Sequence, residues 1–206
     1  MNLEERSFDL RRPAEWLGGV IFASPHSGRD YPDWFLAESM LDPHVLRSSE
    51  EAFVDLLIAP AVAAGAVTLT ARVPRCVVDL NRGADELDPA AIEGTPSRRT
   101  DPRIQSGLGV IPRVVAQGRA IRRGKLSAAE AQRRIAALWR PYHAALESLM
   151  AEAVARLADD PDARIAVLSC AGRTFIAGAD ISEFGKPPVP PSLPDVIAAI
   201  EASEKP

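Results

Sequence analysis

The chain has 206 residues and a net charge of −4, and its 47% hydrophobic and 25% charged residues are typical of a globular protein. The absence of a basic excess argues against a nucleic-acid partner, and no apolar run approaches the roughly 18 residues that span a bilayer. Two cysteines and a charged N-terminus without an apolar core favour a soluble cytoplasmic protein with no membrane partner.

The first part of the sequence predicts a strand followed by helical segments. An edge segment ends at Trp16, residues 19–23 form an apolar run typical of a buried strand, and residues 34–40 predict a short helix. Ser48 and Glu51 have the spacing of a capping box, which predicts that a helix begins there. The expected buried face of that helix is Phe53, Val54, Leu56, Leu57 and Ile58.

The middle of the sequence predicts two more strands and a long loop. Residues 67–71 alternate as a strand, and residues 76–80 predict a second strand that ends at Asn81. The stretch from Gly83 to about Gly109 has few apolar residues and predicts a long loop of the kind that is usually functional or mobile.

The last part of the sequence predicts a long helix, a strand and a short helix. Ser127 and Glu130 form another capping box, and the helix that follows is expected to bend at Pro141. Acidic residues and a proline at 159–162 end it. Residues 165–169 then predict a buried strand, and residues 193–202 a final helix.

His26, at the carboxyl end of the first predicted strand, is a candidate metal ligand. One imidazole with one carboxylate, such as Glu51, gives two of the three protein ligands of a hydrolytic zinc site. The alternative is that His26 only caps the strand end, and that Glu50, Glu51 and Asp55 form a solvated acidic face at a helix N-terminus.

Asn81 and Arg82 follow the strand predicted at 76–80 and are candidate substrate ligands. An arginine there suits bidentate capture of a carboxylate, and Arg75 and Arg113 could line the same pocket. The alternative is a surface ion pair of Arg82 with Asp85 or Glu86. His143 is more typical of a satisfied core or helix-surface histidine, and His44 of an exposed turn.

Up to about residue 155, the sequence resembles the N-formylglutamate amidohydrolase family. The resemblance covers the segments at 23–28, 47–55, 74–82, 86–89, 107–113, 124–127 and 141–143. It implies an α/β fold with a mixed sheet between helices, similar to the zinc carboxypeptidase and aspartoacylase group. It also implies that His26 and Glu51 bind zinc or another divalent metal, and that Arg82, with Asn81 and Arg113 near it, holds the carboxylate of N-formylglutamate or a similar N-acyl amino acid.

Two departures from the family pattern shape the expected chemistry. The family has Asp where this chain has Glu51, so the neighbouring Glu50 is a second candidate ligand. The family also ends a strand with Asp-Cys-His-Ser, whose His is the third metal ligand, whereas this chain has Ala171 at that place, next to Ser169 and Cys170. We therefore expect weak metal binding and impaired hydrolysis, unless another group such as His143 or water completes the site.

The end of the sequence resembles a different family, the enoyl-CoA hydratases or crotonases. The matching residues are 165–184 and 197–201, and the resemblance implies that the backbone N–H of Ala179 contributes to an oxyanion hole. We therefore expect a hydrolase-like domain at 1–157 and a crotonase-like fragment at 158–206 that forms a loosely packed appendage. The alternative functions are an acyl-CoA module and a non-catalytic chimeric remnant.

Overall fold

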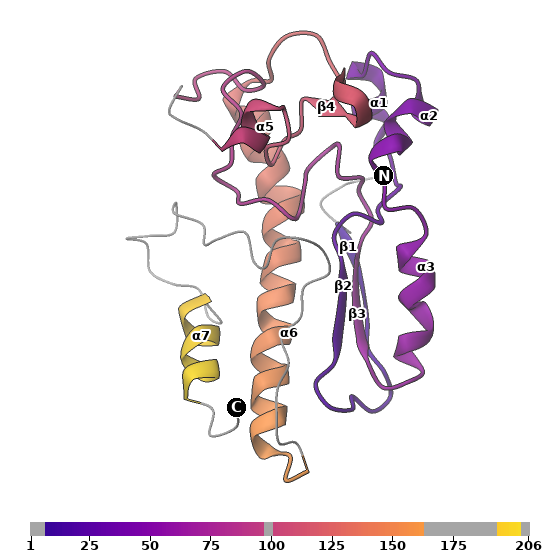
Figure 1. Cartoon of the computed structure of the whole chain (residues 1–206), viewed down its shortest axis with the longest axis vertical. Coiled ribbons are helices and arrows are strands. Elements are labelled where there is room, and N and C mark those ends of the chain that lie inside the picture. Colours follow the sequence, from indigo (N-terminus) through magenta and orange to yellow (C-terminus); the bar gives the residue numbers. More distant parts are fainter. Residues whose placement is uncertain (1–6, 97–100, 163–192, 203–206) are drawn as a thin grey trace.

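The computed structural model describes residues 7–96, 101–162 and 193–202. A three-stranded sheet of order β1-β3-β2 lies at its centre, formed by β1 (Phe8–Arg11), β2 (Ile21–Ser24) and β3 (Val67–Ala71). Strand β1 runs antiparallel to β3 and β2 runs parallel to it, so the sheet is mixed, as predicted. Helix α3 (Val54–Ile58) lies on one side of the sheet and helix α6 (Arg140–Asp159) on the other (Figure 1).

The central strand β3 is the buried part of this small sheet. Val67 and Leu69 are fully buried and Thr68 is almost so, because the strand has a hydrogen-bonded neighbour on each edge. Its register with β2 pairs Ile21 with Val67 and Ser24 with Thr70. The strands predicted at 19–23 and 67–71 are both present, but the first is not buried as predicted, because β2 lies at the edge of the sheet and Phe22 is 42% exposed. The parallel pairing brings the carboxyl ends of β2 and β3 to the same edge of the sheet.

The long helical segment begins at the capping residue that the sequence predicts. The hydroxyl of Ser127 accepts a hydrogen bond from the backbone N–H of Glu130 at the start of α5 (Ala128–Arg134). A π-helical segment, Ile135–Trp139, then leads directly into α6. Pro141 lies in the first turn of α6, where its missing N–H is tolerated. The bend predicted at Pro141 stays a prediction, and the departure from α-helical geometry that the structure shows is the π-helical segment just before it.

The capping box predicted at Ser48 and Glu51 is wrong. Ser48 lies in a short 3-10 helix, Arg47–Ser49, that follows α1 (Asp33–Glu38) and α2 (Pro43–Leu46). Its hydroxyl donates backwards to the carbonyl of Val45 and caps nothing downstream. Helix α3 begins later, at Val54, after Phe53 in a left-handed conformation, and another 3-10 helix, Ala59–Val62, follows it.

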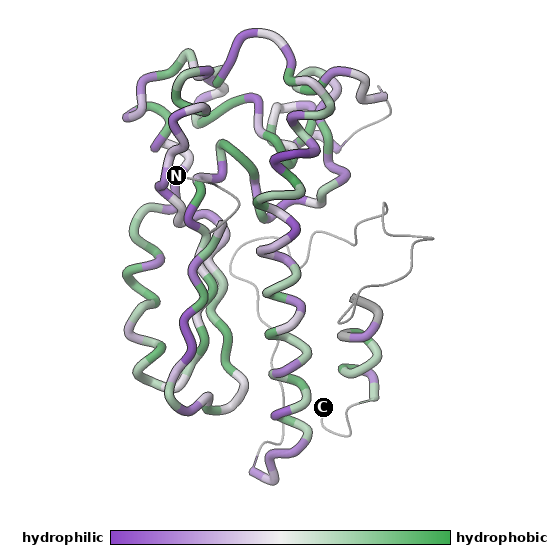
Figure 2. The backbone as a smooth tube through the Cα atoms, turned by 180° about the vertical axis from the view of Figure 1, so that it is seen from behind, coloured by the Kyte–Doolittle hydropathy of each residue, from purple (hydrophilic) through white to green (hydrophobic). Residues whose placement is uncertain are grey.

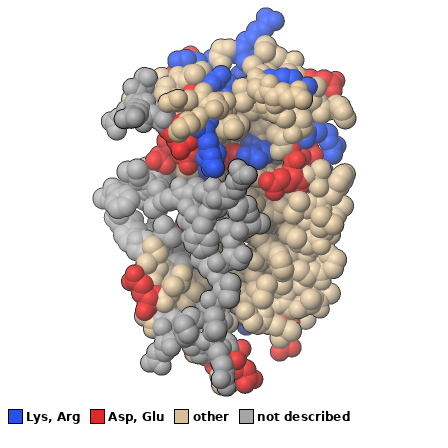
Figure 3. All heavy atoms as spheres, in the orientation of Figure 1, with Lys and Arg blue, Asp and Glu red and all other residues tan. Residues whose placement is uncertain are grey.

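The predicted buried face of α3 is also wrong in part. Leu57 is 76% exposed, and Phe53 and Leu56 are more than half exposed, whereas Val54 and Ile58 are partly buried. Residues three or four apart share a helix face, so consecutive apolar residues cannot all turn toward the sheet. The surface over α3 accordingly carries few charged side chains (Figure 3), and the helix is largely hydrophobic from end to end (Figure 2).

The segment 76–80 is not the strand that its composition predicts. Residues 75–77 form a turn closed by the bond from the N–H of Val77 to the carbonyl of Pro74, and the N–H of Asp79 bonds to the carbonyl of Val110. A run that is buried on all sides gives the same apolar pattern whether it is a strand or a packed loop. Four side chains of segment 76–80 nevertheless belong to the hydrophobic core: Cys76, Val77, Val78 and Leu80.

The described parts of 83–109 form a long connection, as predicted, interrupted only by the short helix α4 (Pro102–Gln105). A two-stranded hairpin of β4 (Val114–Val115) and β5 (Arg119–Ala120) follows it. The isoleucines at 92, 111 and 121 pack into the same core as Tyr142 and Leu149 of α6. The loops above the sheet are therefore anchored by their own apolar residues.

The final helix α7 (Leu193–Glu201) confirms the prediction for 193–202 and contacts α6. The strand expected at 165–169, and with it Ser169, Cys170, Ala171 and Ala179, lies outside the described residues. In the part of the chain that the structure describes, no helix combines the length and hydropathy needed to cross a membrane.

Candidate functional site

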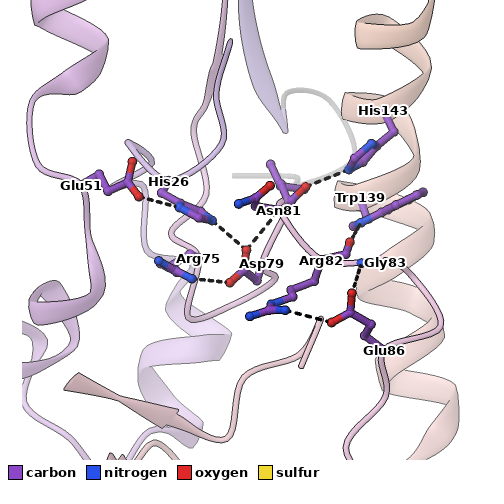
Figure 4. Close-up of polar contacts among 11 residues, drawn as sticks. His26, Glu51, Arg75, Asp79, Asn81, Arg82, Gly83, Glu86, Trp139 and His143 are labelled. Atoms are coloured by element: carbon purple, nitrogen blue, oxygen red, sulfur yellow. Dashed lines mark hydrogen bonds and ion pairs between the residues drawn. The ribbon is translucent and has the colours of Figure 1, made fainter. Parts of the chain in front are cut away.

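His26 is the centre of a buried polar cluster at the carboxyl end of β2. Only 4% of the residue is exposed, yet both ring nitrogens have partners. Nδ1 lies 2.8 Å from Oε1 of Glu51, and Nε2 lies 2.7 Å from Oδ1 of Asp79 (Figure 4). The backbone N–H of Glu51 also bonds to the carbonyl of His26, which fixes the two residues relative to each other. His26 therefore joins two segments that are far apart in the sequence.

Asp79 is held rigidly by the turn that follows it. Its Oδ1 accepts the backbone N–H of Asn81 at 3.0 Å, an Asx turn of the kind that aspartate favours. Its Oδ2 accepts from Arg75 at 2.6 Å. Burial alone would raise the pKa of Asp79, but the hydrogen bond and charge of His26, with the charge of Arg75, outweigh it and hold the pKa at about 2. Asp79 is thus a fixed carboxylate that orients the His26 ring.

The structure separates the two neighbouring glutamates. Glu51 turns toward His26 and keeps 51% of its side chain exposed, so its carboxylate is open to solvent. Glu50 turns the other way: its side chain is 2% exposed, accepts a hydrogen bond from the hydroxyl of Tyr31 and pairs with Arg47. Of the two candidate ligands, Glu51 alone lies against the imidazole.

The donor set fits a metal in part. Two ligand atoms of one tetrahedral zinc ion lie about 3.3 Å apart. Nδ1 of His26 and Oε1 of Glu51 are 2.8 Å apart, which is near that spacing. Asp79, on the other ring nitrogen, occupies the place of the carboxylate that orients a metal-binding histidine. Among the described residues, however, no group of three or more His, Cys, Asp or Glu side chains is arranged to hold a metal ion.

Two other potential donors are engaged elsewhere. His143 contacts the carbonyl of Leu80 through Nε2 at 2.9 Å and stacks on Trp139, so it is a satisfied histidine, as its position predicts. Cys76 is fully buried, and burial raises the pKa of its thiol to about 11, which disfavours the thiolate that a metal needs. The expected third-ligand position, Ala171, lies outside the described residues.

Arg82 forms an ion pair with Glu86, one of the two surface partners that the sequence offered as the alternative to substrate binding. Its Nη1 lies 3.2 Å from Oε2 of Glu86, whose other oxygen accepts the N–H of Gly83. Asn81, by contrast, is exposed on the same turn. A substrate carboxylate would therefore have to share or displace Glu86 before it could bind Arg82.

Arg113 belongs to the neighbouring loop. Its Nε donates to the buried carboxylate of Asp88 at 3.0 Å and its Nη2 to the carbonyl of Gln105. These bonds tie the segment at 107–113 to the long connection. The hydrogen bonds of Arg113 go to Asp88 and Gln105 and not to His26 or Glu51, so its predicted role in substrate binding stays a prediction.

The sequence reasoning missed residues that complete the cluster. Asp79 lies within the family-like segment 74–82, and its place two residues before Asn81, which suits an Asx turn, was the signal that could have identified it. Trp139 gave no such signal. Its indole N–H donates to the carbonyl of Arg82 at 2.7 Å from a helix 57 residues away in the sequence.

Comparisons with known proteins identify a family and a fold that this chain resembles. A family model described as N-formylglutamate amidohydrolase matches residues 18–163. The crystal structure of N-formylglutamate amidohydrolase from Ralstonia eutropha JMP134 is 36% identical, with a TM-score of 0.67 over 73% of this chain and 54% of that chain. Gene product Atu2144 from Agrobacterium tumefaciens, at 20% identity and a TM-score of 0.54, covers 76% of this chain and 54% of its own, and shows a similar fold.

These matches cover only part of this chain and part of each solved structure. The chain spans about half the length of these two solved structures. No curated protein matches it. The family match ends at residue 163, and none of these comparisons supports the crotonase-like resemblance of the residues beyond it.

Proposed function

Because this chain belongs to the N-formylglutamate amidohydrolase family, we propose that it acts on N-formyl-L-glutamate or a similar N-acyl amino acid, releasing formate and glutamate. The observation that carries the proposal is the clamped imidazole of His26 between Glu51 and Asp79. An exposed carboxylate beside a buried histidine that a second carboxylate orients is the arrangement of a metal-dependent hydrolase site.

His26 and Glu51 would hold the metal, which when bound would polarise the amide carbonyl and acidify water. Asp79 would keep the proton on Nε2 of His26 and leave Nδ1 free to bind. The exposed side chain of Glu51 lets solvent and substrate reach this edge of the sheet. The contacts of His26 with Glu51 and Asp79 and the exposure of Glu51 support these proposed roles.

We predict that zinc binds weakly and that formate release is close to background. Two protein ligands are one fewer than hydrolytic zinc sites use, and losing a ligand should cost more than the 10–100-fold that loss of an orienting partner costs. The measurement is a competitive zinc titration with a formate assay on the unmodified chain, with His26→Ala as the control that removes a ligand.

Restoring the family's histidine by Ala171→His should raise zinc affinity by at least about tenfold if that side chain reaches the site. Tight stoichiometric zinc with turnover in the unmodified chain would show instead that another group completes the site. Zinc binding that survives His26→Ala unchanged would place the metal elsewhere and remove the basis of the proposal.

Arg82 would hold the substrate carboxylate, and Arg82→Lys should weaken glutamate binding about tenfold because an ammonium cannot reproduce the guanidinium fork. Calorimetry with glutamate measures the effect. Glu86→Gln is the matched variant, since it removes the competing charge at 3.2 Å and should tighten binding. Equal affinities in all three proteins would exclude Arg82 as the carboxylate ligand.

A further inference from the structure

The turn that carries Asn81 and Arg82 is anchored by two side chains from another part of the chain. Nε2 of His143 faces the carbonyl of Leu80 at 2.9 Å, and Nε1 of Trp139 donates to the carbonyl of Arg82 at 2.7 Å. The two accepting carbonyls flank Asn81. Figure 4 shows both rings approaching the turn from the helix, on the side away from Glu51.

The two rings work as one unit. Trp139 ends the π-helical segment and His143 lies four residues later in α6, so both project from the same helix face. Their rings stack with centroids 3.8 Å apart and planes 21° apart. π-helical turns occur frequently at functional sites, and this one lies where the helix meets the turn.

His143 is fixed as a hydrogen-bond donor. A carbonyl oxygen can only accept, so the nitrogen that faces Leu80 carries the proton. Burial lowers the pKa of His143 to about 4, against the opposing effect of the bond to Leu80, so the ring is neutral at pH 7. The bond to the carbonyl of Leu80 therefore persists in the neutral state.

The remaining bonds of the turn are made by its own residues. Asp79 accepts the backbone N–H groups of Asn81 and Arg82, through its side chain and its carbonyl respectively. Glu86 accepts the N–H of Gly83 at 3.1 Å. The backbone N–H groups of the turn thus bond to residues of the same segment, and two of its carbonyls accept from the helix, so its backbone has little freedom. Asn81 itself remains exposed.

We infer that Trp139 and His143 are positioning residues that hold Asn81 and Arg82 in the orientation needed to bind a substrate carboxylate. Neither ring contacts His26 or Glu51 in the described structure, so they act on substrate binding and not on the metal ligands. The part of the inference that concerns substrate rests on the proposed function. The anchoring of the turn does not.

The test uses variants that remove a donor and keep a ring. Trp139→Phe and His143→Phe should each weaken glutamate binding about fivefold, the effect of one hydrogen bond, and should speed amide hydrogen exchange at residues 81–83. His143→Gln restores an N–H donor and should recover most of the affinity. Zinc affinity, titrated without substrate, should be unchanged in all three.

Trp34→Phe is the matched control for the loss of indole. The Trp34 N–H is buried but has no hydrogen-bond partner among the described residues, so its removal should leave exchange at 81–83 as it is. Unchanged exchange in Trp139→Phe and His143→Phe would overturn the anchoring. Faster exchange with unchanged glutamate affinity would overturn the role in substrate binding.

The two proposals can fail separately. If the unmodified chain binds zinc but no glutamate or N-formylglutamate, the proposed substrate is wrong, and so is the role of the two rings in binding it. The exchange rates then decide the anchoring alone. Faster exchange confined to 81–83, with β3 still protected, supports it, and a loss of protection throughout the sheet contradicts it.

Discussion

Gly28→Ala should lower the free energy of unfolding by about 3 kcal/mol or more, because overpacking against backbone has no cheap relief. A Cβ on Gly28 would overlap the carbonyl of Val73 and lie 2.7 Å from the carbonyl carbon of Arg72. Those atoms cannot move easily, since the Arg72 carbonyl accepts the N–H of Asp30. Urea denaturation measures the loss.

The same substitution should disturb the site itself. Gly28 lies two residues after His26, so displacing it shifts the imidazole between Glu51 and Asp79. Gly94→Ala is the control: Gly94 has φ +71° and open space around its Cβ position, so it should lose only the roughly 1–2 kcal/mol of a left-handed alanine. Equal losses in the two variants would mean that the 28 and 73 segments do not pack as described.

The glycine at 28 shows what the sequence could and could not reveal. Its segment was marked as a candidate site by His26, and strands at 19–23 and 67–71 followed from their composition, whereas their parallel pairing did not. The reason for glycine, a close approach of the chain at Val73, depends on a segment 45 residues away. A local pattern does not contain that information.

The same limit explains the errors in secondary structure. Residues 76–80 have the composition of a buried strand, but their hydrogen-bonding groups meet Pro74 and Val110 and not a neighbouring strand. The burial of the segment accounts for its apolar pattern, whereas its tertiary contacts determine its backbone conformation. On α3 the apolar run is longer than one face can bury, so Leu56 and Leu57 remain exposed.

The candidate site was predictable to the extent that it is local. Ser-Pro-His-Ser-Gly and Asp-Leu-Asn-Arg could be identified by residue type and by resemblance. The choice between Glu50 and Glu51 could not, because adjacent side chains point in different directions and only the fold shows which one meets His26. The anchoring by Trp139 depends on a helix that approaches from far along the chain.

A second large effect concerns two buried arginines near α1. Arg134 is 1% exposed, donates to Glu38 and Glu130, and lies over the ring of Trp34 at 4.4 Å. Arg122 is 7% exposed, yet none of its guanidinium nitrogens has a hydrogen-bond partner among the described residues, and its Nε lies 4.0 Å from Glu38. Burial and the charge of Arg134 lower the pKa of Arg122 to about 10.

The two arginines should therefore respond to the same substitution with opposite signs. Arg134→Met removes the partner of two carboxylates and should lower the free energy of unfolding by about 3 kcal/mol. Arg122→Met removes a desolvated charge, keeps an apolar side chain of similar reach, and should raise the free energy of unfolding by about 2 kcal/mol.

Each variant is the control for the other, because both replace a buried guanidinium by the same thioether. Urea denaturation of the three proteins at one pH gives both differences. If Arg122→Met destabilises the chain as much as Arg134→Met, then the Arg122 guanidinium has a partner that stabilises it, and its burial does not lower the stability of the fold.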